Sequence, residues 1–244
     1  MIKLKILIAA PICEGKNYSI NEWLESVAII MRRNPNKQIN FCFSVNNASQ
    51  EYENKLKQIE LYPVSKRLKV KPIILRLQQK TKEGIVATIA RSREQIRRYA
   101  VLQHYNYILW LDTDTIPTQD VLERLLSQKK DFISGVYTYK GTNRVVATWL
   151  VNKEKDLCSN VPYEVVKKAG LENHLIKIRG CGFGCVLISR KVFIDTQFES
   201  NLTKGQGEDI RYCQLAALKG FSIWLDPRVM CQHKSDSQYV EGEK

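Results

Sequence analysis

The stretch YILWLDTDTIP, residues 107–117, is an apolar run that ends in two aspartates one residue apart. The run has the length and composition of a buried strand, which places Asp112 and Asp114 at its carboxyl end. Positions i and i+2 of an extended chain point to the same side, and two such carboxylates repel each other unless a cation lies between them. The pair therefore indicates a site for a hard divalent ion, Mg²⁺ or Mn²⁺, although capping of a turn or of the next helix explains it equally well.

Outward from this strand, apolar runs alternate with helical patterns along the first half of the chain. The expected strands cover 3–11, 39–47, 68–77 and 105–114, and the expected helices cover 19–33, 50–62 and 85–104. The last helix has an apolar stripe expected to face the core and arginines on its other faces: Ile85, Ile89, Ile96 and Tyr99 or Ala100 in the stripe, Arg91, Arg97 and Arg98 outside it. This alternation predicts an α/β fold with a mostly parallel central sheet and helices on both faces.

The second half of the chain is less regular. We expect a helix over 118–128, strands over 131–139 and 144–151, a loop with a short helix over 159–173, glycine-interrupted strands over 174–193, a helix over 207–220 and a last strand over 221–227. No repeat, low-complexity tract or flexible linker divides the chain. The sequence therefore predicts a single domain over 1–235, with halves of about 1–114 and 115–235, and a flexible tail over 236–244.

Two further features of the second half carry chemistry. Glu208 and Asp209 open the helix expected over 207–220, directly after the glycine-containing loop TKGQGED. A carboxylate at a helix N-terminus accepts backbone N–H bonds and stays ionised, so one that faces a cleft can act as a general base. Plain complementation of the helix dipole is the alternative explanation. His233 follows the last expected strand, and it gains meaning only in combination with the acidic residues, because a lone histidine is more often a surface residue.

Composition bears on partners and compartment. The 244-residue chain carries a formal net charge of +13, which favours anionic partners such as phosphate-bearing molecules, nucleic acid or an acidic membrane surface. No apolar window approaches the roughly 20 residues of a membrane helix. The seven cysteines form no Cys-x-x-Cys pair, which argues against a zinc site and a disulfide framework. We expect a cytoplasmic protein, with peripheral contact to the inner face of a membrane as a further option.

The order of these motifs resembles the GT-A nucleotide-sugar glycosyltransferases, most closely the family-2 group. The resemblance covers about residues 4–234 and rests on Asp112-Thr113-Asp114, on Gly180, Gly182 and Gly184, on Glu208-Asp209 and on His233. It implies the GT-A fold and a Mn²⁺ or Mg²⁺ ion held on the donor pyrophosphate by Asp114 and His233, with Asp112 on the ribose or on metal-bound water. The three glycines would let the backbone approach the donor or acceptor sugar closely.

The same resemblance implies nucleotide contacts. Pro11 and Ile12 lie in AAPIC (9–13), which resembles the turn that holds base and ribose, and Thr113 belongs to the same nucleotide site. Asn46 lies in SVNNAS (44–49), where the family often has Val-Asp-Asp-Gly-Ser; an amide keeps the hydrogen bonding to the base edge but removes the charge. Arg91, in ATIARSR, resembles a family element near the nucleotide, and its alternative is a solvated helix charge.

The resulting hypothesis is a metal-dependent enzyme that moves a sugar from a nucleotide-diphosphate sugar to a hydroxyl of an unknown glycan, lipid-linked or protein acceptor. Asp209 would deprotonate that hydroxyl, and Glu208 would position the acceptor or the base. Attack from the face opposite the leaving group would invert the anomeric configuration.

Two other classes compete with this hypothesis. A sugar-nucleotide nucleotidyltransferase also uses a nucleotide-binding sheet and acidic metal ligands, but it usually needs a loop rich in glycine and basic residues after the first strand. Here that loop offers only Gly15 and Lys16. A non-catalytic nucleic-acid-binding protein is suggested by the Lys- and Arg-rich stretch 66–98, yet no nucleic-acid module is recognisable. Nucleic acid is therefore the less favoured partner.

Overall fold

The computed structural model describes residues 3–62, 69–78, 83–138, 148–152, 157–202 and 206–234. Strands and helices alternate in the amino-terminal half: β1 (Lys5–Ile12), the short 3₁₀ helix η1 (Glu14–Lys16), α1 (Ile20–Arg33), β2 (Gln38–Val45), α2 (Gln50–Lys57), β3 (Ile73–Arg76), α3 (Ile85–Leu102) and β4 (Tyr107–Leu111). The carboxyl-terminal half contains β5 (Thr115–Ile116), α4 (Val121–Ser127), β6 (Phe132–Tyr137), β7 (Thr148–Asn152), β8 (Leu157–Asn160), α5 (Tyr163–Leu171), β9 (Ile176–Ile178), β10 (Gly180–Cys181), β11 (Cys185–Ser189), α6 (Arg190–Asp195), α7 (Glu208–Leu218) and β12 (Ile223–His233).

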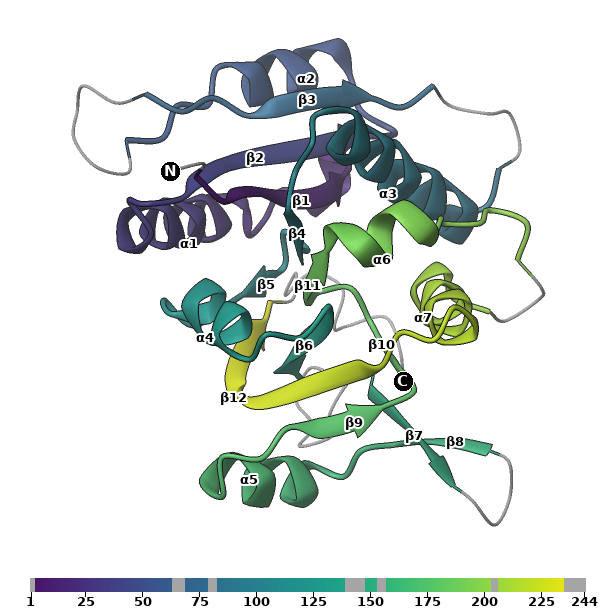
Figure 1. Cartoon of the computed structure of the whole chain (residues 1–244). Coiled ribbons are helices and arrows are strands. Elements are labelled where there is room, and N and C mark those ends of the chain that lie inside the picture. Colours follow the sequence, from purple (N-terminus) through teal and green to yellow (C-terminus); the bar gives the residue numbers. More distant parts are fainter. Residues whose placement is uncertain are drawn as a thin grey trace, which may run out of the picture.

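Nine of the described strands form one sheet in the order β3-β2-β1-β4-β11-β6-β12-β5, and β9 pairs with β12. Its β3-β2-β1-β4 half is parallel throughout, which confirms the predicted α/β fold. β11 lies antiparallel between β4 and β6, so the sheet continues from one half of the chain into the other. Figure 1 shows α2 and β3 at one end of the molecule and α5, β7, β8 and β9 at the other.

The core has two layers because side chains of β1 alternate between the faces of the sheet. Ile6 and Ile8 pack in the layer that contains Trp23 of α1, whereas Leu7 and Ala9 pack in the layer that contains Ile96 of α3. All six side chains are fully buried. A parallel sheet covered on both faces needs such continuously apolar strands. In open α/β sheets, ligands bind beyond the carboxyl ends of the strands.

Helix α3 differs from the sequence prediction at two positions. Ile85, predicted to lie in the core stripe, is 77% exposed, whereas Arg97, predicted to lie outside it, is buried. The Arg97 guanidinium donates to Glu94 Oε2 (2.7 Å) and to the carbonyl of Phe193 (2.7 Å). Apolar periodicity overlooks such an arginine, because its partners offset the cost of burying its charge.

Strand β12 is longer than predicted, and this difference shapes the site. The last strand was expected to end at Pro227, but it continues to His233. Proline has no N–H for the ladder, and the register against β6 shifts between Leu225 and Met230, where a bulge accommodates it. As a result His233 pairs with Thr115 of β5 instead of following a finished strand.

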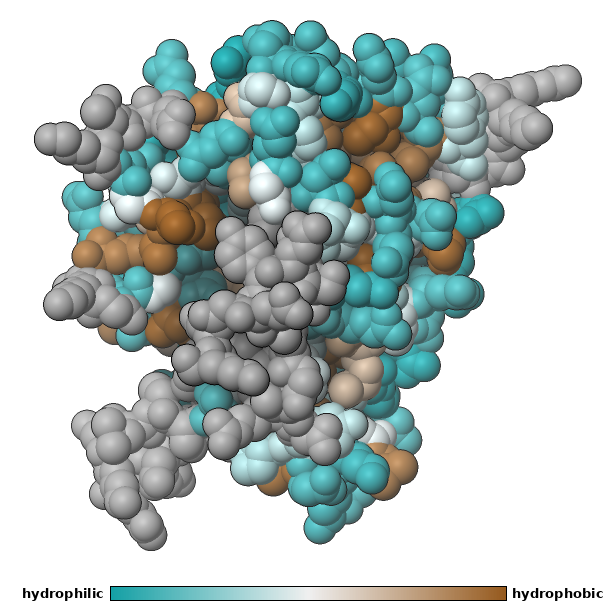
Figure 2. All heavy atoms as spheres, turned by 180° about the vertical axis from the view of Figure 1, so that it is seen from behind, coloured by the Kyte–Doolittle hydropathy of each residue, from teal (hydrophilic) through white to brown (hydrophobic). Residues whose placement is uncertain are grey.

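The remaining boundaries and surface features need only brief mention. The helix expected over 50–62 ends at Lys57, and residues 144–147 and 236–244 lie outside the described part of the chain. Cysteines with described side chains are free thiols. No helix among the described residues is long and apolar enough to cross a membrane. Figure 2 shows a largely hydrophilic face on which hydrophobic areas are separated by polar side chains.

Candidate active site

The turn Asp112–Asp114 lies directly after β4, at the carboxyl edge of the parallel strands. Side chains from the start of α1 hold its backbone: Ser19 Oγ donates to the Thr113 carbonyl (2.8 Å), and Trp23 Nε1 donates to the Leu111 carbonyl (2.9 Å). Ser19 directly precedes α1, but its side chain does not cap that helix. The hydroxyl instead fixes the acidic turn against the amino-terminal half.

Asp114 and His233 lie side by side because β12 reaches the same turn. His233 Nε2 is 3.6 Å from Asp114 Oδ2, and the backbone N–H of Lys234 donates to the Asp114 carbonyl (2.7 Å). The Tyr18 hydroxyl is 3.5 Å from the same carboxylate oxygen. Two ligand atoms at right angles on one ion, each about 2.1 Å from it, stand about 3 Å apart. A small adjustment would therefore let this pair share a divalent cation.

Beyond this pair, protein ligands for a metal are scarce. Within the described ranges, no group of three or more His, Cys, Asp and Glu side chains could hold an ion. A divalent cation at Asp114 and His233 would thus take its other ligands from water or from substrate oxygens. Mg²⁺ is commonly bound in this way, through one or two carboxylates together with substrate phosphates.

Asp112 has a different partner, Arg93 of α3. Arg93 Nη2 lies 3.0 and 3.1 Å from the two carboxylate oxygens of Asp112, and Nε lies 3.4 Å from Glu208 Oε1. Burial lowers the pKa of Arg93, but the charges of Asp112 and Glu208 outweigh this and hold that pKa above its ordinary value. Burial raises the pKa of Asp112 to about 6, against the attraction of Arg93 and with the repulsion of Asp114.

Glu208 and Asp209 form the first turn of α7, as predicted. No side chain caps this helix at Gly207, and Asp209 Oδ1 accepts a hydrogen bond from the Ile210 N–H (2.7 Å). Burial raises the pKa of Asp209 to about 6, and the adjacent Glu208 raises it further than the Ile210 hydrogen bond lowers it. A carboxyl group that titrates near neutral pH is suited to act as a general base.

A cavity of about 460 Å³ brings these groups together at the carboxyl ends of β1, β2 and β4. It is lined by eight of the site residues predicted from the sequence: Pro11, Ile12, Asn46, Asp112, Thr113, Asp114, Glu208 and Asp209. Sequence reasoning missed other lining residues, notably Arg93, Tyr137 and Phe183. The sequence offered one signal for Arg93, because this residue lies two positions after Arg91 in ATIARSR.

The other predicted site residues lie outside the cavity lining. Arg91 pairs with Glu83 (2.5 Å) and donates to the Gln78 carbonyl (2.8 Å). His233 is not among the lining residues, but it lies beside Asp114, which is one of them.

The three predicted glycines do not line the cavity. Gly180 belongs to the short strand β10, and Gly182 and Gly184 flank Phe183, whose side chain lines the cavity. A Cβ added at Gly184 would lie 2.8 Å from the Tyr137 ring. The close approach at Gly184 is therefore to a side chain of the protein itself.

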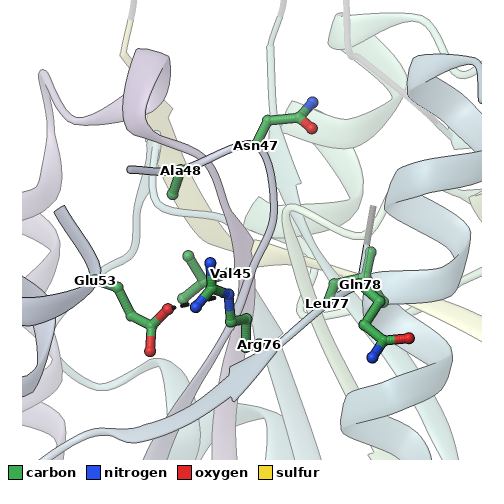
Figure 3. Close-up of a pocket in the computed structure, with 7 residues that line it drawn as sticks. All are labelled: Val45, Asn47, Ala48, Glu53, Arg76, Leu77 and Gln78. Atoms are coloured by element: carbon green, nitrogen blue, oxygen red, sulfur yellow. Dashed lines mark ion pairs between the residues drawn. The ribbon is translucent and has the colours of Figure 1, made fainter. Parts of the chain in front are cut away.

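A second cavity, of about 550 Å³, lies beside the ends of β2 and β3 (Figure 3). In the close-up, Arg76 points toward Glu53, with which it forms an ion pair (3.4 Å), and Gln78 lies on the other side of the cavity. Asn47 lines both cavities. The larger cavity lacks the acidic pairs, so the chemistry is concentrated in the smaller one.

Comparisons with known proteins agree with this arrangement at the level of fold. No protein-family model matches the sequence, and no curated protein sequence matches it. Among solved structures, GalNAc-T7 with UDP, GalNAc and Mn²⁺ superposes with a TM-score of 0.60 at 11% identity, over 100% of this chain and 46% of that one. S. aureus TarS 1–349 in complex with UDP gives 0.54 at 10% identity, over 95% of this chain and 60% of that one. The chain has a GT-A fold.

A third similar structure belongs to another class of enzyme. The inositol-1-phosphate CTP transferase from T. maritima superposes with a TM-score of 0.50 at 10% identity, over 98% of this chain and 92% of that one. This chain thus spans about half the length of the GalNAc-T7 chain but nearly all of the CTP transferase. The structural neighbours are glycosyltransferases and a nucleotidyltransferase, which share the use of nucleotide-linked substrates.

Proposed function

We propose that this protein is a divalent-metal-dependent glycosyltransferase that moves a sugar from a nucleotide-diphosphate sugar to an acceptor hydroxyl. One observation carries the proposal: a single cavity joins the carboxylates after β4 to the acid pair that opens α7. Metal ligands for a donor diphosphate and a base for an acceptor are the two chemical needs of this reaction. The likeness to UDP- and Mn²⁺-containing GT-A structures supports the same class.

On the donor side, Asp114 and His233 would hold Mn²⁺ or Mg²⁺, which when bound neutralises charge on the departing nucleoside diphosphate. Asp112, which Arg93 contacts, would accept hydrogen bonds from the ribose or from metal-bound water. Pro11, Ile12 and Asn46 would line the nucleoside. Arg91 keeps its proposed role near the nucleotide only if its ion pair with Glu83 opens, since that pair now occupies its guanidinium.

On the acceptor side, Asp209 would remove the proton from the attacking hydroxyl. Its raised pKa lets it accept a proton near neutral pH and release it again afterwards. Glu208 is buried against Arg93 and would position the acceptor or Asp209. Attack on the face opposite the leaving group then gives inversion.

The donor side is tested by calorimetric titration with UDP-, GDP- and dTDP-sugars, each with and without Mn²⁺ or Mg²⁺. We expect one nucleotide to bind more tightly with metal, and Asp114→Ala and His233→Ala to weaken that binding by at least about 10-fold, the scale on which even outer-shell partners of a metal act. Asp195→Ala, which removes an exposed carboxylate outside the cavity, is the matched control. Metal-independent binding in the wild type, or equal losses in the control, would contradict the metal role.

The acceptor side is tested with Asp209→Asn once a donor is known. This variant should bind donor and metal as the wild type does, yet lose nearly all transfer, because an amide cannot take the hydroxyl proton. Proton NMR of the product then reports the anomeric configuration. Full activity of the variant would remove Asp209 as the base, and a retained configuration would contradict inversion.

Nucleotidyl transfer is the second candidate, favoured by the likeness to the T. maritima CTP transferase. It differs in its products, because joining a nucleoside triphosphate to a sugar or inositol phosphate releases pyrophosphate. A pyrophosphate-release assay with the four nucleoside triphosphates therefore separates the two activities. Pyrophosphate release without sugar transfer would replace the first proposal with this one.

A further inference from the structure

Arg93 lies where the donor and acceptor sides of the cavity meet. It comes from the middle of α3, yet its guanidinium contacts Asp112 after β4 and Glu208 at the start of α7. The residue is only 3% exposed. Its guanidinium carbon also lies 5.4 Å from the ring centre of Trp110 and 5.3 Å from that of Phe183. Arg93 therefore joins three elements through one rigid group.

Arg93 carries a buried charge whose two ionic partners both line the cavity. Burying a guanidinium is costly, and two carboxylates and two aromatic faces offset that cost. Arg93 Nη1 has no hydrogen-bond partner within the part of the chain that the structure describes. Well-packed apolar residues often replace a buried ion pair without loss of stability. The carboxylates that Arg93 holds thus point to a role beyond packing.

Arg97, one turn further along α3, provides a comparison within the same helix. It is similarly buried, at 6% exposed. Its guanidinium bonds to Glu94 and to the Phe193 carbonyl, and neither residue lines the cavity. The two arginines share residue type, helix and burial. They differ in that only the partners of Arg93 line the cavity.

We propose that Arg93 is a positioning residue that fixes the carboxylates of Asp112 and Glu208 relative to each other and thereby aligns the donor with the acceptor. The role in transfer rests on the function proposed above. Without Arg93, these two carboxylates and the neighbouring Asp209 would repel one another and turn away from their present positions. Lysine cannot replace the planar fork, because its single ammonium group cannot hold both carboxylates in this geometry.

The positioning is tested without reference to any reaction, by crystal structures of Arg93→Met and Arg97→Met. We expect the Asp112 and Glu208 carboxylates to turn away from their wild-type positions in Arg93→Met and to keep them in Arg97→Met. If Arg93→Met does not fold, Arg93→Lys serves instead and should displace at least one of the two. Carboxylates that keep their positions in the Arg93 variant would overturn the proposal, whether or not the protein transfers sugar.

The alignment is tested by a kinetic double-mutant cycle that combines Arg93→Met with Glu208→Gln. Misplacement of groups by about 1 Å can cost about 100-fold in rate, so we expect a loss of kcat/KM of that order in the wild-type background. In the Glu208→Gln background the further loss should be much smaller, because part of what Arg93 positions is already altered. Arg97→Met should show no such coupling.

The outcomes of this cycle separate the two proposals. Equal losses from Arg93→Met in both backgrounds would overturn the alignment role, since the residues would then act independently. A wild type that transfers no sugar from any donor would contradict the proposed function, and the crystal structures would still decide whether Arg93 positions the two carboxylates.

Discussion

Replacing Gly184 by alanine tests what this glycine contributes to the site. The sequence explains it by a backbone that approaches a sugar. In the structure, an added Cβ would lie 2.8 and 2.9 Å from two atoms of the Tyr137 ring and 2.9 Å from Thr115 Oγ1. Real Cβ atoms essentially never approach other atoms so closely, so the ring or the backbone must move.

The size of the effect follows from how little room Tyr137 has. The residue is 8% exposed, its hydroxyl accepts a hydrogen bond from the Gly184 N–H (3.3 Å), and its ring centre lies 5.6 Å from that of His233. Overpacking of this kind costs about 1–3 kcal/mol. In a chain of this size each kcal/mol lowers Tm by about 2–4 °C, so the expected fall is roughly 2–12 °C. A displaced Tyr137 would also disturb His233 and weaken the metal binding proposed there.

The assay is thermal unfolding of Gly184→Ala together with titration of nucleotide in the presence of Mn²⁺. Gly170→Ala is the matched control, because its added Cβ would come no closer than 3.5 Å to Pro227 and lies within α5. Alanine in a helix should stabilise the protein by about 0.5–1 kcal/mol relative to glycine. An unchanged Tm for Gly184→Ala, with a loss of sugar affinity alone, would refute this reasoning and favour the explanation from the sequence.

Three further predictions concern protonation and the acidic turn. Because burial raises the pKa of Asp209 to about 6, kcat should fall as the pH drops through about 6, and a pH–rate profile without that step would contradict Asp209 as the base. Unfolding returns Asp112 and Asp209 to pKa values near 4, so the folded protein binds more protons between about pH 4 and 6. Its free energy of unfolding, measured by urea titration at several pH values, should therefore decrease as pH rises through that window, and it should decrease less steeply in Asp209→Asn. An equal dependence on pH in the wild type and in Asp209→Asn would argue against the burial of this carboxyl. Trp23→Phe removes the donor to the Leu111 carbonyl and should lower the free energy of unfolding by about 1–3 kcal/mol in the same assay, whereas no loss would mean that water replaces the indole N–H.

The sequence predicted those parts of the fold that depend on local patterns. The apolar run before Asp112 has the pattern of a buried strand in a parallel sheet. Asp112 and Asp114 were therefore expected directly after that strand, at the carboxyl ends of the parallel strands. Glu208 and Asp209 were equally predictable, because glycine before an acidic first turn marks the start of a helix. Such signals need no knowledge of what the rest of the chain does.

The positions of Arg93 and His233 depend on tertiary contacts that local sequence patterns do not reveal. The apolar stripe of α3 gives no reason to bury a charge, and Arg93 is buried only because Asp112 and Glu208 arrive from distant parts of the chain. His233 reaches Asp114 only because a bulge carries β12 past Pro227, and proline in a sequence normally signals the end of a strand. The omission of Arg93 and the early end predicted for the last strand both concern partners set by tertiary structure, which periodicity cannot encode, and the family resemblance alone placed His233 with Asp114.

The charge of the whole chain also says little about the charge of the site. A net charge of +13 favours anionic ligands, yet the described lining of the smaller cavity places four carboxylates around the single guanidinium of Arg93. A nucleoside diphosphate would meet repulsion from these groups unless a cation entered with it. The basic surface can raise the local concentration of such a ligand, but within the acidic cavity we expect its binding to require a metal. The electrostatics of this cavity thus support the proposed metal dependence without reference to any family likeness, and we expect nucleotide affinity to rise most steeply with Mn²⁺ or Mg²⁺ when the carboxylates are fully ionised.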